Sequence, residues 1–203
     1  MDYFSQFPIT SALIAANIVA TLIAFAAPDF FEQNLFRVRP ILKQGEWHRV
    51  VTSAFLHVNG LHLLVNMFVL YMFGPILETV LGVGGYLLVY FAALLGASVW
   101  MLADKRGEPE YSAVGASGAV SGVVLAFCLF EPFQMLYLFF ILPMPAFVFG
   151  IGYIALSFWL SRQESTMVAH GAHLGGALAG LAATVLVYPE VIGIFTRQLT
   201  GAA

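Results

Sequence analysis

Long apolar runs are the feature that most constrains this 203-residue sequence. A helix needs about 20 mostly apolar residues to cross the hydrocarbon of a bilayer, and runs of that length recur here between clusters of Gly, Pro and charged residues. Hydrophobic residues make up 61% of the chain and charged residues 9%, whereas soluble domains carry roughly 25% charge. The sequence therefore predicts a membrane-embedded protein, with room for roughly six crossings.

The runs predict spans at residues 8–27, 60–80, 84–103, 116–131, 145–161 and 167–188. The first span lacks a basic n-region and is long for a signal peptide, so we expect a retained helix. The prediction is one all-α, multi-pass membrane domain over residues 1–203, with no soluble domain before or after it. Residues 29–59 form the longest connection, which we expect to lie mainly at the membrane interface and to be partly embedded. Prolines bracket residues 135–142, which predicts an irregular, partly buried connection there.

Charge and cysteine content exclude several classes of function. The net charge of −3 comes from acids scattered at span ends, and no basic run suggests nucleic acid. Cys128 is the single cysteine, so it can form no internal disulfide and is expected to serve packing. We expect lipid and membrane proteins as partners, with no cofactor and no metal; the oligomeric state is left open.

Polar residues within the spans gather near three helix starts. An even number of crossings separates the second, fourth and sixth spans, so their N-terminal ends share one membrane face. Polar groups facing hydrocarbon are costly and are functional candidates by default. Those near the three shared ends are His57, His62, Asn66, Ser117, His170 and His173. We expect them to converge in one pocket that water can reach.

Ser117 is the candidate nucleophile. It lies in the stretch Gly115-Ala116-Ser117-Gly118, at a predicted helix start where unpaired amides and the helix dipole favour an oxyanion. Small residues also pack transmembrane helices closely, and the glycine pairs Gly118/Gly122 and Gly176/Gly180 are each spaced by four. If these small faces meet, Ser117 comes within reach of a histidine on the last span.

The base and the oxyanion donors are less constrained by the residues alone. His170 and His173 are three apart on adjacent parts of one helical face, so either can serve as base. No Asp or Glu is well placed to orient the imidazole, which predicts a Ser-His dyad. His62 and Asn66 are four apart and project from one face, either as oxyanion donors or as ordinary interhelical hydrogen-bonding groups. For Ser121 we expect an ordinary helix–helix hydrogen bond.

These motifs, in this order, resemble the rhomboid family from Trp47 to Gly180. The residues that carry the resemblance are the His62/Asn66 pair, preceded by His57, then Gly115 to Gly118, and finally Ala172, His173, Gly176 and Gly180. The resemblance implies a six-helix bundle, a Ser117–His173 dyad rather than one with His170, and an oxyanion site from Asn66, His62 and the Ser117 amide. It also implies metal-free hydrolysis of transmembrane substrates.

Two positions depart from the family pattern. The family often has an aromatic residue one turn after the nucleophile, packed on the catalytic imidazole, whereas this chain has Ser121. The first-loop Trp-Arg pattern is altered around Trp47, for which an interface anchor is the preferred interpretation. The fifth span, short and led by proline, is either a gate for substrate or a plain helix distorted at its start.

Orientation is where two inferences disagree. Seven of the eight basic residues lie on the face of the predicted site, which the positive-inside rule makes cytoplasmic. Resemblance to bacterial rhomboids implies a cytoplasmic (inner) membrane protein whose site opens to the exterior, and we follow the resemblance. Two rival functions remain: an inactive rhomboid-like factor that binds membrane proteins, and a transporter or metal site lined by histidines.

Overall fold

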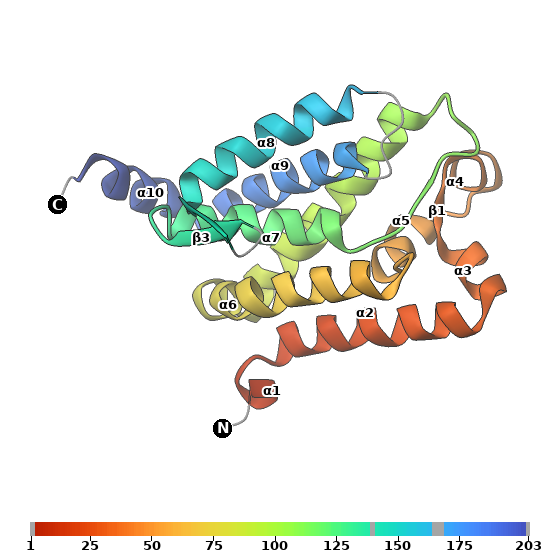
Figure 1. The fold of residues 1–203 in the computed structure, drawn as a ribbon, viewed down its shortest axis with the longest axis horizontal. Helices are drawn as coiled ribbons and strands as arrows, with labels where there is room; N and C mark the ends of the chain where they lie inside the picture. Colours follow the sequence, from red (N-terminus) through yellow and green to blue (C-terminus); the bar gives the residue numbers. More distant parts are fainter. Residues whose placement is uncertain (1–2, 139–140, 164–168, 202–203) are drawn as a thin grey trace.

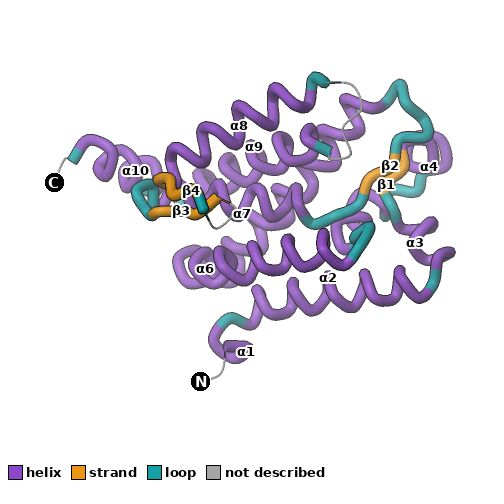
Figure 2. Tube along the Cα trace, viewed as in Figure 1, coloured by secondary structure: helices purple, strands orange, loops and turns teal. Residues whose placement is uncertain are grey.

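A computed structural model describes residues 3–138, 141–163 and 169–201, and most of them are helical (Figure 1). The helices are α1 (Tyr3–Gln6), α2 (Pro8–Ala26), α3 (Pro28–Asn34), α4 (Val38–Gln44), α5 (Arg49–Thr52), the 3-10 turn η1 (Ser53–Phe55), α6 (Gly60–Lys105), α7 (Ser117–Phe130), α8 (Ala146–Ser161), α9 (His170–Val187) and α10 (Val191–Thr200). Two short antiparallel pairs accompany them: β1 (Phe36–Arg37) with β2 (Ser112–Ala113), and β3 (Met135–Leu138) with β4 (Leu142–Pro145). The two pairs lie at opposite ends of the molecule (Figure 2).

Three described helices, α2, α6 and α9, are long and apolar enough to cross a membrane, while α7 and α8 are shorter apolar helices. At 46 residues α6 is about twice the length that one crossing needs. It breaks at Gly82, whose φ of 66° lies in the left-handed region that glycine adopts without strain. The helices expected at 60–80 and 84–103 therefore meet at a bend rather than a loop. The expected start of the last span, residues 167 and 168, lies outside the described residues, and the count of six crossings stays a prediction.

Helix α7 lies at the centre of the bundle, packed against α6 and α9. Every residue from Gly118 to Cys128 is buried, so little of its surface reaches the outside. Glycine makes this packing possible, because a Cβ on Gly122 would lie 3.0 Å from the backbone oxygen of Gly176 and 3.1 Å from the Cα of Gly180. The two glycine pairs therefore form one contact between α7 and α9, and it brings the helix backbones close together.

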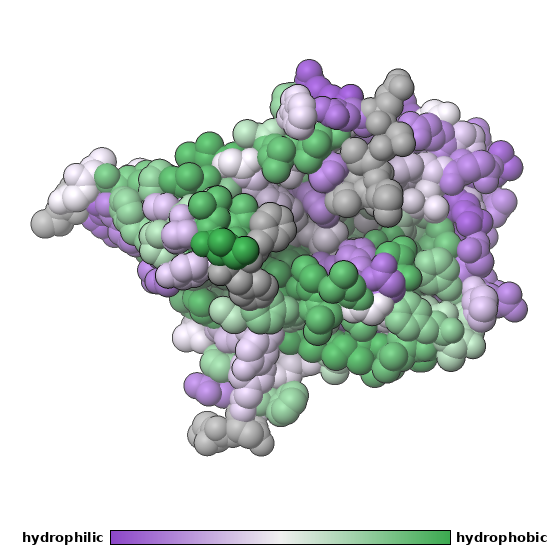
Figure 3. Space-filling model, in the orientation of Figure 1, coloured by the Kyte–Doolittle hydropathy of each residue, from purple (hydrophilic) through white to green (hydrophobic). Residues whose placement is uncertain are grey.

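The outer surface is apolar, as in a protein surrounded by lipid. Large hydrophobic side chains on the outward faces of α2, α6 and α8 are exposed, among them Leu22, Leu64, Val99 and Trp159. Hydrophobic residues cover the middle of the face in Figure 3, and hydrophilic ones gather toward the edge that carries α3 and α4. Soluble monomers rarely expose an apolar surface of this extent. The chain is an integral membrane protein.

Glu78 lies two residues before the end of the span predicted at 60–80, as expected of the acids, but it has a structural role that the sequence did not indicate. It lies within α6 and is buried, and its carboxylate accepts hydrogen bonds from the backbone N–H groups of Ile9 (2.9 Å) and Thr10 (2.8 Å) and from the Thr10 hydroxyl (2.7 Å). The first N–H groups of a helix have no partner within the helix. A carboxylate from α6 therefore caps α2 and fixes the two helices together.

The connections are more regular than the sequence indicated. The stretch expected to be irregular around residues 135–142 forms the β3–β4 hairpin, with Met135 opposite Pro145 and Leu138 opposite Leu142. The long first connection contains α3, α4, α5 and η1, and β1 joins it to β2 just ahead of α7. Arg49 holds this connection together, since its buried guanidinium donates to Glu46 Oε2 and to the carbonyls of Glu32 and Leu35. Trp47 is exposed, and Cys128 is buried.

Candidate active site

A serine and a histidine from two neighbouring helices meet at the N-terminal ends of α7 and α9. The Nε2 atom of His173 lies 2.8 Å from the Oγ atom of Ser117, which is the reach that a nucleophile and its base require. Ser117 is the first residue of α7, where backbone amides are unpaired and the dipole favours negative charge. The pair can therefore move a proton and present a hydroxyl beside an anion-stabilising helix end.

The glycine contact sets the spacing of this pair. Gly176 lies one turn after His173 on α9, and Gly118 directly follows Ser117 on α7. A Cβ on Gly176 would lie 3.0 Å from the Cα of Gly118 and would collide with its backbone oxygen. Because no side chain separates the helices here, the one-carbon side chain of Ser117 and the imidazole of His173 can span the gap.

The backbone just before Ser117 is held by the first connection. Gly115 has φ of 131°, a conformation that side chains rarely adopt, and its N–H donates to the Ser53 carbonyl at 3.0 Å. The next N–H, of Ala116, donates to His57 Nε2 at 3.4 Å. Two amides in succession are thus tied to residues of the first connection, and they aim the start of α7.

His57 has its own fixed partners. Thr21 donates its hydroxyl hydrogen to the Phe55 carbonyl at 3.1 Å, so the 2.9 Å contact between Thr21 Oγ1 and His57 Nδ1 has the imidazole as donor. Nδ1 then carries the proton, and Nε2 is free to accept from Ala116. His57 lies in the connection before α6, and burial together with the neighbouring His62 lowers its pKa to about 4. The ring is therefore neutral, as an acceptor at Nε2 must be.

His62 and Asn66 lie on the first turns of α6, beside the same backbone. Asn59 caps this helix by accepting from the His62 N–H at 2.8 Å. The His62 ring packs against Gly115, where an added Cβ would lie 2.6 Å from its Cε1 atom, and contacts the His57 ring edge to face at 5.0 Å. Asn66 is buried and donates from Nδ2 to the His62 carbonyl at 2.9 Å. The structure thus brings His57, His62 and Gly115 together, with Asn66 one turn deeper.

His170 lies beside His173 rather than beside Ser117. The two imidazoles are edge to face with centroids 5.8 Å apart, and His170 is only partly buried. Among the described residues no carboxylate hydrogen-bonds to the His173 ring. The arrangement is a serine and an imidazole without a described acidic partner.

Two further residues touch the pair, and sequence reasoning missed one of them. Ser121, one turn after Ser117, donates to the Ser117 carbonyl at 2.6 Å and is in hydrogen-bond contact with the Tyr153 hydroxyl on α8. The helix–helix hydrogen bond expected for Ser121 is therefore present. Tyr153 was not singled out, and its ring lies stacked on that of His173. A hydroxyl-bearing ring within an otherwise apolar span was the available signal.

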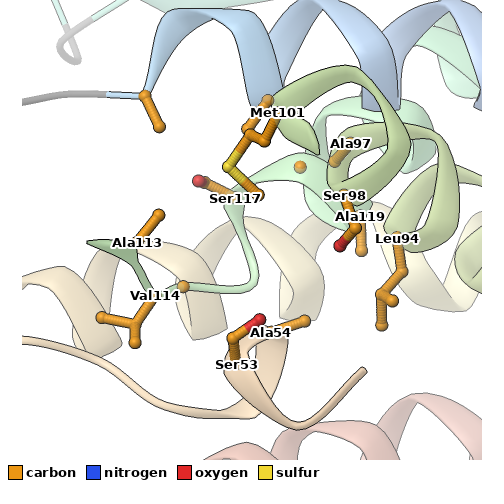
Figure 4. Close-up of a pocket in the computed structure, with 14 residues that line it drawn as sticks. Ser53, Ala54, Leu94, Ala97, Ser98, Met101, Ala113, Val114, Ser117 and Ala119 are labelled. Atoms are coloured by element: carbon orange, nitrogen blue, oxygen red, sulfur yellow. The ribbon is translucent and has the colours of Figure 1, made fainter. Parts of the chain in front are cut away.

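A small cavity adjoins Ser117 (Figure 4). It has a volume of about 30 Å³ and is lined by small or flexible side chains, among them Ser53, Ala97, Ser98 and Met101. A cavity needs about 10–15 Å³ of such volume to hold one water molecule. The cavity has room for a water molecule or a small side chain next to the nucleophile.

Comparison with known proteins adds an independent finding. A family model described as "Rhomboid domain" matches residues 44–190. The chain is 33% identical over 164 residues to "RHOMBOID-like protein 12, mitochondrial" of Arabidopsis thaliana, covering 73% of this chain and 49% of that protein. It is 30% identical over 185 residues to "Rhomboid protease GluP" of Bacillus subtilis (strain 168), covering 90% and 32%. It is 31% identical over 139 residues to the human "Presenilin-associated rhomboid-like protein, mitochondrial", covering 65% and 36%. The chain thus spans about half or less of the length of these relatives.

Proposed function

This chain belongs to the rhomboid family, and on that premise we propose that it is an intramembrane serine endopeptidase with Ser117 as nucleophile and His173 as base. Its substrates are other membrane proteins, cut in or near their transmembrane helices. The observation that carries the proposal is the 2.8 Å contact between Ser117 Oγ and His173 Nε2. One relative is named a protease, which supports the assignment.

In the first half of the reaction, His173 Nε2 takes the Ser117 proton while Oγ attacks the scissile carbonyl carbon. The bond from Oγ to that carbon forms, and the carbonyl oxygen becomes an oxyanion. The protonated imidazole then gives its proton to the leaving amine as the peptide bond breaks. The product is an ester between Ser117 and the N-terminal part of the substrate.

The oxyanion is stabilised by the Ser117 backbone N–H together with His62 and Asn66. The amide at a helix start is free to donate, and the His62 ring lies against Gly115, in the loop that leads to it. Asn66 carries two N–H hydrogens, of which one donates to the His62 carbonyl. Losing one such donor typically costs about 3 kcal/mol of barrier.

Water completes the reaction by attacking the ester, with His173 again as base. Ser117 and His173 lie at the N-terminal ends of α7 and α9, so water can enter from the membrane face that these ends share. A transmembrane substrate must unwind to expose its peptide bond, so helices containing Gly, Ala, Ser or Pro at the cut are favoured. The cavity beside Ser117, with its volume of about 30 Å³, fits small side chains at that point.

We also propose six crossings: α2, the two halves of α6, α7, α8 and α9. The domain would cover residues 1–203 and lie in a bacterial cytoplasmic membrane with its site toward the exterior. The positive-inside rule concerns cations that stay near the cytoplasmic surface. Arg49 is instead buried and hydrogen-bonded within the first connection. It therefore does not count among the cations that favour a cytoplasmic position for this face. A reporter fused to the C-terminus tests this orientation.

The decisive experiment uses the purified chain in detergent with a fluorescent transmembrane-helix substrate and a fluorophosphonate probe. We expect cleavage and labelling by the wild type, and neither by Ser117→Ala or His173→Ala. Ser161→Ala is the matched control, because Ser161 lies at the end of α8 and its hydrogen bond to a described residue is to the Phe158 carbonyl of the same helix turn. Undiminished cleavage by Ser117→Ala refutes the nucleophile assignment.

The same experiment decides between the proposal and its rivals. A wild type that neither cleaves nor labels, yet binds membrane proteins, is the inactive rhomboid-like factor. The histidine-lined metal site is disfavoured by His57, whose two ring nitrogens are already bonded to Thr21 and to the Ala116 amide. A metal ligand needs one of those nitrogens free.

A further inference from the structure

We propose that Tyr153 of α8 is a positioning residue for the His173 imidazole and that the Ser121 hydroxyl holds the tyrosine ring in place. This inference rests on the proposed Ser117–His173 dyad and adds a third helix to it. Tyr153 touches neither substrate nor the reacting atoms, so its action is through His173 alone.

The two rings are stacked. The centroids of the Tyr153 and His173 rings are 6.3 Å apart and their planes differ by 24°, an offset parallel arrangement that aromatic rings favour. In a triad a carboxylate fixes the tautomer and plane of the imidazole. No described carboxylate bonds to His173. The described contacts of its ring are the Ser117 hydroxyl, the edge-to-face contact with His170 and the face of Tyr153, and of the two ring contacts only that with Tyr153 is nearly parallel to the imidazole plane.

The tyrosine ring is itself fixed through its hydroxyl. Ser121 has one hydroxyl hydrogen, and it donates that hydrogen to the Ser117 carbonyl at 2.6 Å. In the contact between Ser121 and Tyr153, the tyrosine must therefore be the donor. The chain of donors runs from Tyr153 to Ser121 to the carbonyl of Ser117. The support of the base is thereby anchored to the nucleophile's own backbone.

A second ring supports the tyrosine from its own helix. Phe149, one turn earlier on α8, stacks on Tyr153 with centroids 5.6 Å apart and planes 24° from parallel. Phe149 with Tyr153 and Tyr153 with His173 are thus two stacked pairs that share the tyrosine ring. Because Tyr153 is held at both its hydroxyl and its face, it can restrict rotation of the imidazole that it contacts.

This support matters most after proton transfer. When the Ser117 proton moves to Nε2, the imidazole becomes a cation, and the face of a tyrosine ring attracts a cation. No bond forms to Tyr153, and no proton leaves it. Its face stabilises the imidazolium and keeps Nε2 directed at the oxygen, first as base and then as acid. The contact comes from α8, so displacement of α8 from α9 would release the imidazole.

The test measures the rate constant of fluorophosphonate labelling and, separately, kcat and KM for a transmembrane-helix substrate. Tyr153→Ala is expected to label about 10-fold more slowly and to lose kcat by a similar factor, with KM changed less than about twofold. Tyr153→Phe keeps the ring and is expected to lose about threefold. Phe147→Ala is the matched control, because this half-buried ring on α8 contacts Phe133 instead of His173; its labelling is expected to stay within about twofold of wild type.

Rescue separates positioning from general packing. Ser121 faces the tyrosine, so Ser121→Tyr combined with Tyr153→Ala places a ring from α7 in the vacated space and is expected to restore labelling to within about threefold of wild type. Full labelling of Tyr153→Ala, an equal loss in Phe147→Ala, or no gain in the double variant overturns the inference. If Tyr153→Ala does not fold, Ser121→Ala decides: about threefold slower labelling at an unchanged thermal midpoint supports it, and an unchanged rate overturns it. A wild type without labelling overturns the proposed function, and this inference with it.

Discussion

Replacing Glu78 tests whether the carboxylate that joins α6 to α2 is a major source of stability. Glu78 is 7% exposed and accepts three hydrogen bonds, two from α2 backbone N–H groups and one from the Thr10 hydroxyl. Hydrogen bonds to charged groups contribute about 1.5–3 kcal/mol each, and a buried donor left without a partner costs about 1–3 kcal/mol. These terms are not additive within one network.

From these magnitudes, Glu78→Ala is expected to lower the free energy of unfolding by about 3–5 kcal/mol. Glu78→Gln keeps one acceptor oxygen and turns an N–H₂ group toward the remaining donors, so we expect a loss of about 2–4 kcal/mol. Both exceed the roughly 1 kcal/mol that a typical substitution costs. The capped end of α2 lies away from Ser117, so the turnover of molecules that remain folded is expected to be unchanged.

The measurement is reversible unfolding in mixed micelles, followed by circular dichroism, with substrate cleavage at a temperature where every variant is folded. Glu131→Gln is the matched control, since it makes the same chemical change at an exposed position, and it is expected to stay within about 0.5 kcal/mol of wild type. A Glu78→Ala protein as stable as Glu131→Gln would refute the reasoning. A large loss of kcat in folded Glu78→Ala would also refute it, because the carboxylate would then affect catalysis as well as stability.

Two further predictions concern the site's framework. Gly176→Ala places a Cβ against the Gly118 backbone, so it is expected to abolish cleavage and to lower the free energy of unfolding by several kcal/mol, beyond the roughly 1–3 kcal/mol usual for overpacking. Gly152→Ala on α8 is the control, because the space around Gly152 is open, and its free energy of unfolding should lie within about 1 kcal/mol of that of wild type. Equal stability of the two variants would contradict the close helix contact. In the folded chain the pKa of His57 is lowered to about 4, whereas in the unfolded chain it is about 6.5. Between these two pH values the unfolded chain binds a proton that the folded chain does not bind. The free energy of unfolding is therefore highest above about pH 6.5 and falls as the pH drops toward 4, by about 2 kcal/mol at pH 5. Measured at pH 7.5 and 5.0, the stability difference of His57→Gln should be smaller than that of wild type by about 2 kcal/mol. An undiminished difference would assign the pH dependence to other groups.

The sequence predicted the parts of this protein that local patterns determine. Apolar run length located the helices, and Gly82 stands in the gap expected between residues 80 and 84. Spacing by four predicted glycine faces on α7 and α9, and the described contacts place Gly122 against Gly176 and Gly180. An even number of crossings between the second, fourth and sixth spans placed the histidines on the same membrane face as Ser117. The distance from Ser117 Oγ to His173 Nε2 agrees with that placement. Their catalytic roles stay predictions.

What the sequence did not reveal are pairings between residues far apart in the chain. Glu78 meets Thr10 across 68 positions, and Ser121 meets Tyr153 across 32. Neither pairing produces a periodic pattern in the sequence, because each depends on how whole helices are rotated relative to one another. The β3–β4 hairpin was missed for a related reason: its prolines argue against a helix without specifying which strand pairing replaces it.

The burial of α7 has a consequence for how the protein responds to its membrane. This helix has 14 residues and is about 21 Å long, shorter than a hydrocarbon core of about 30 Å. A lipid-facing helix of that length would thin the bilayer or tilt to match it, whereas α7 is enclosed by other helices and meets almost no acyl chain. Changes of bilayer thickness therefore act on the outer helices first. The depth of Ser117 is set inside the protein, and lipids of different chain length should leave it in place.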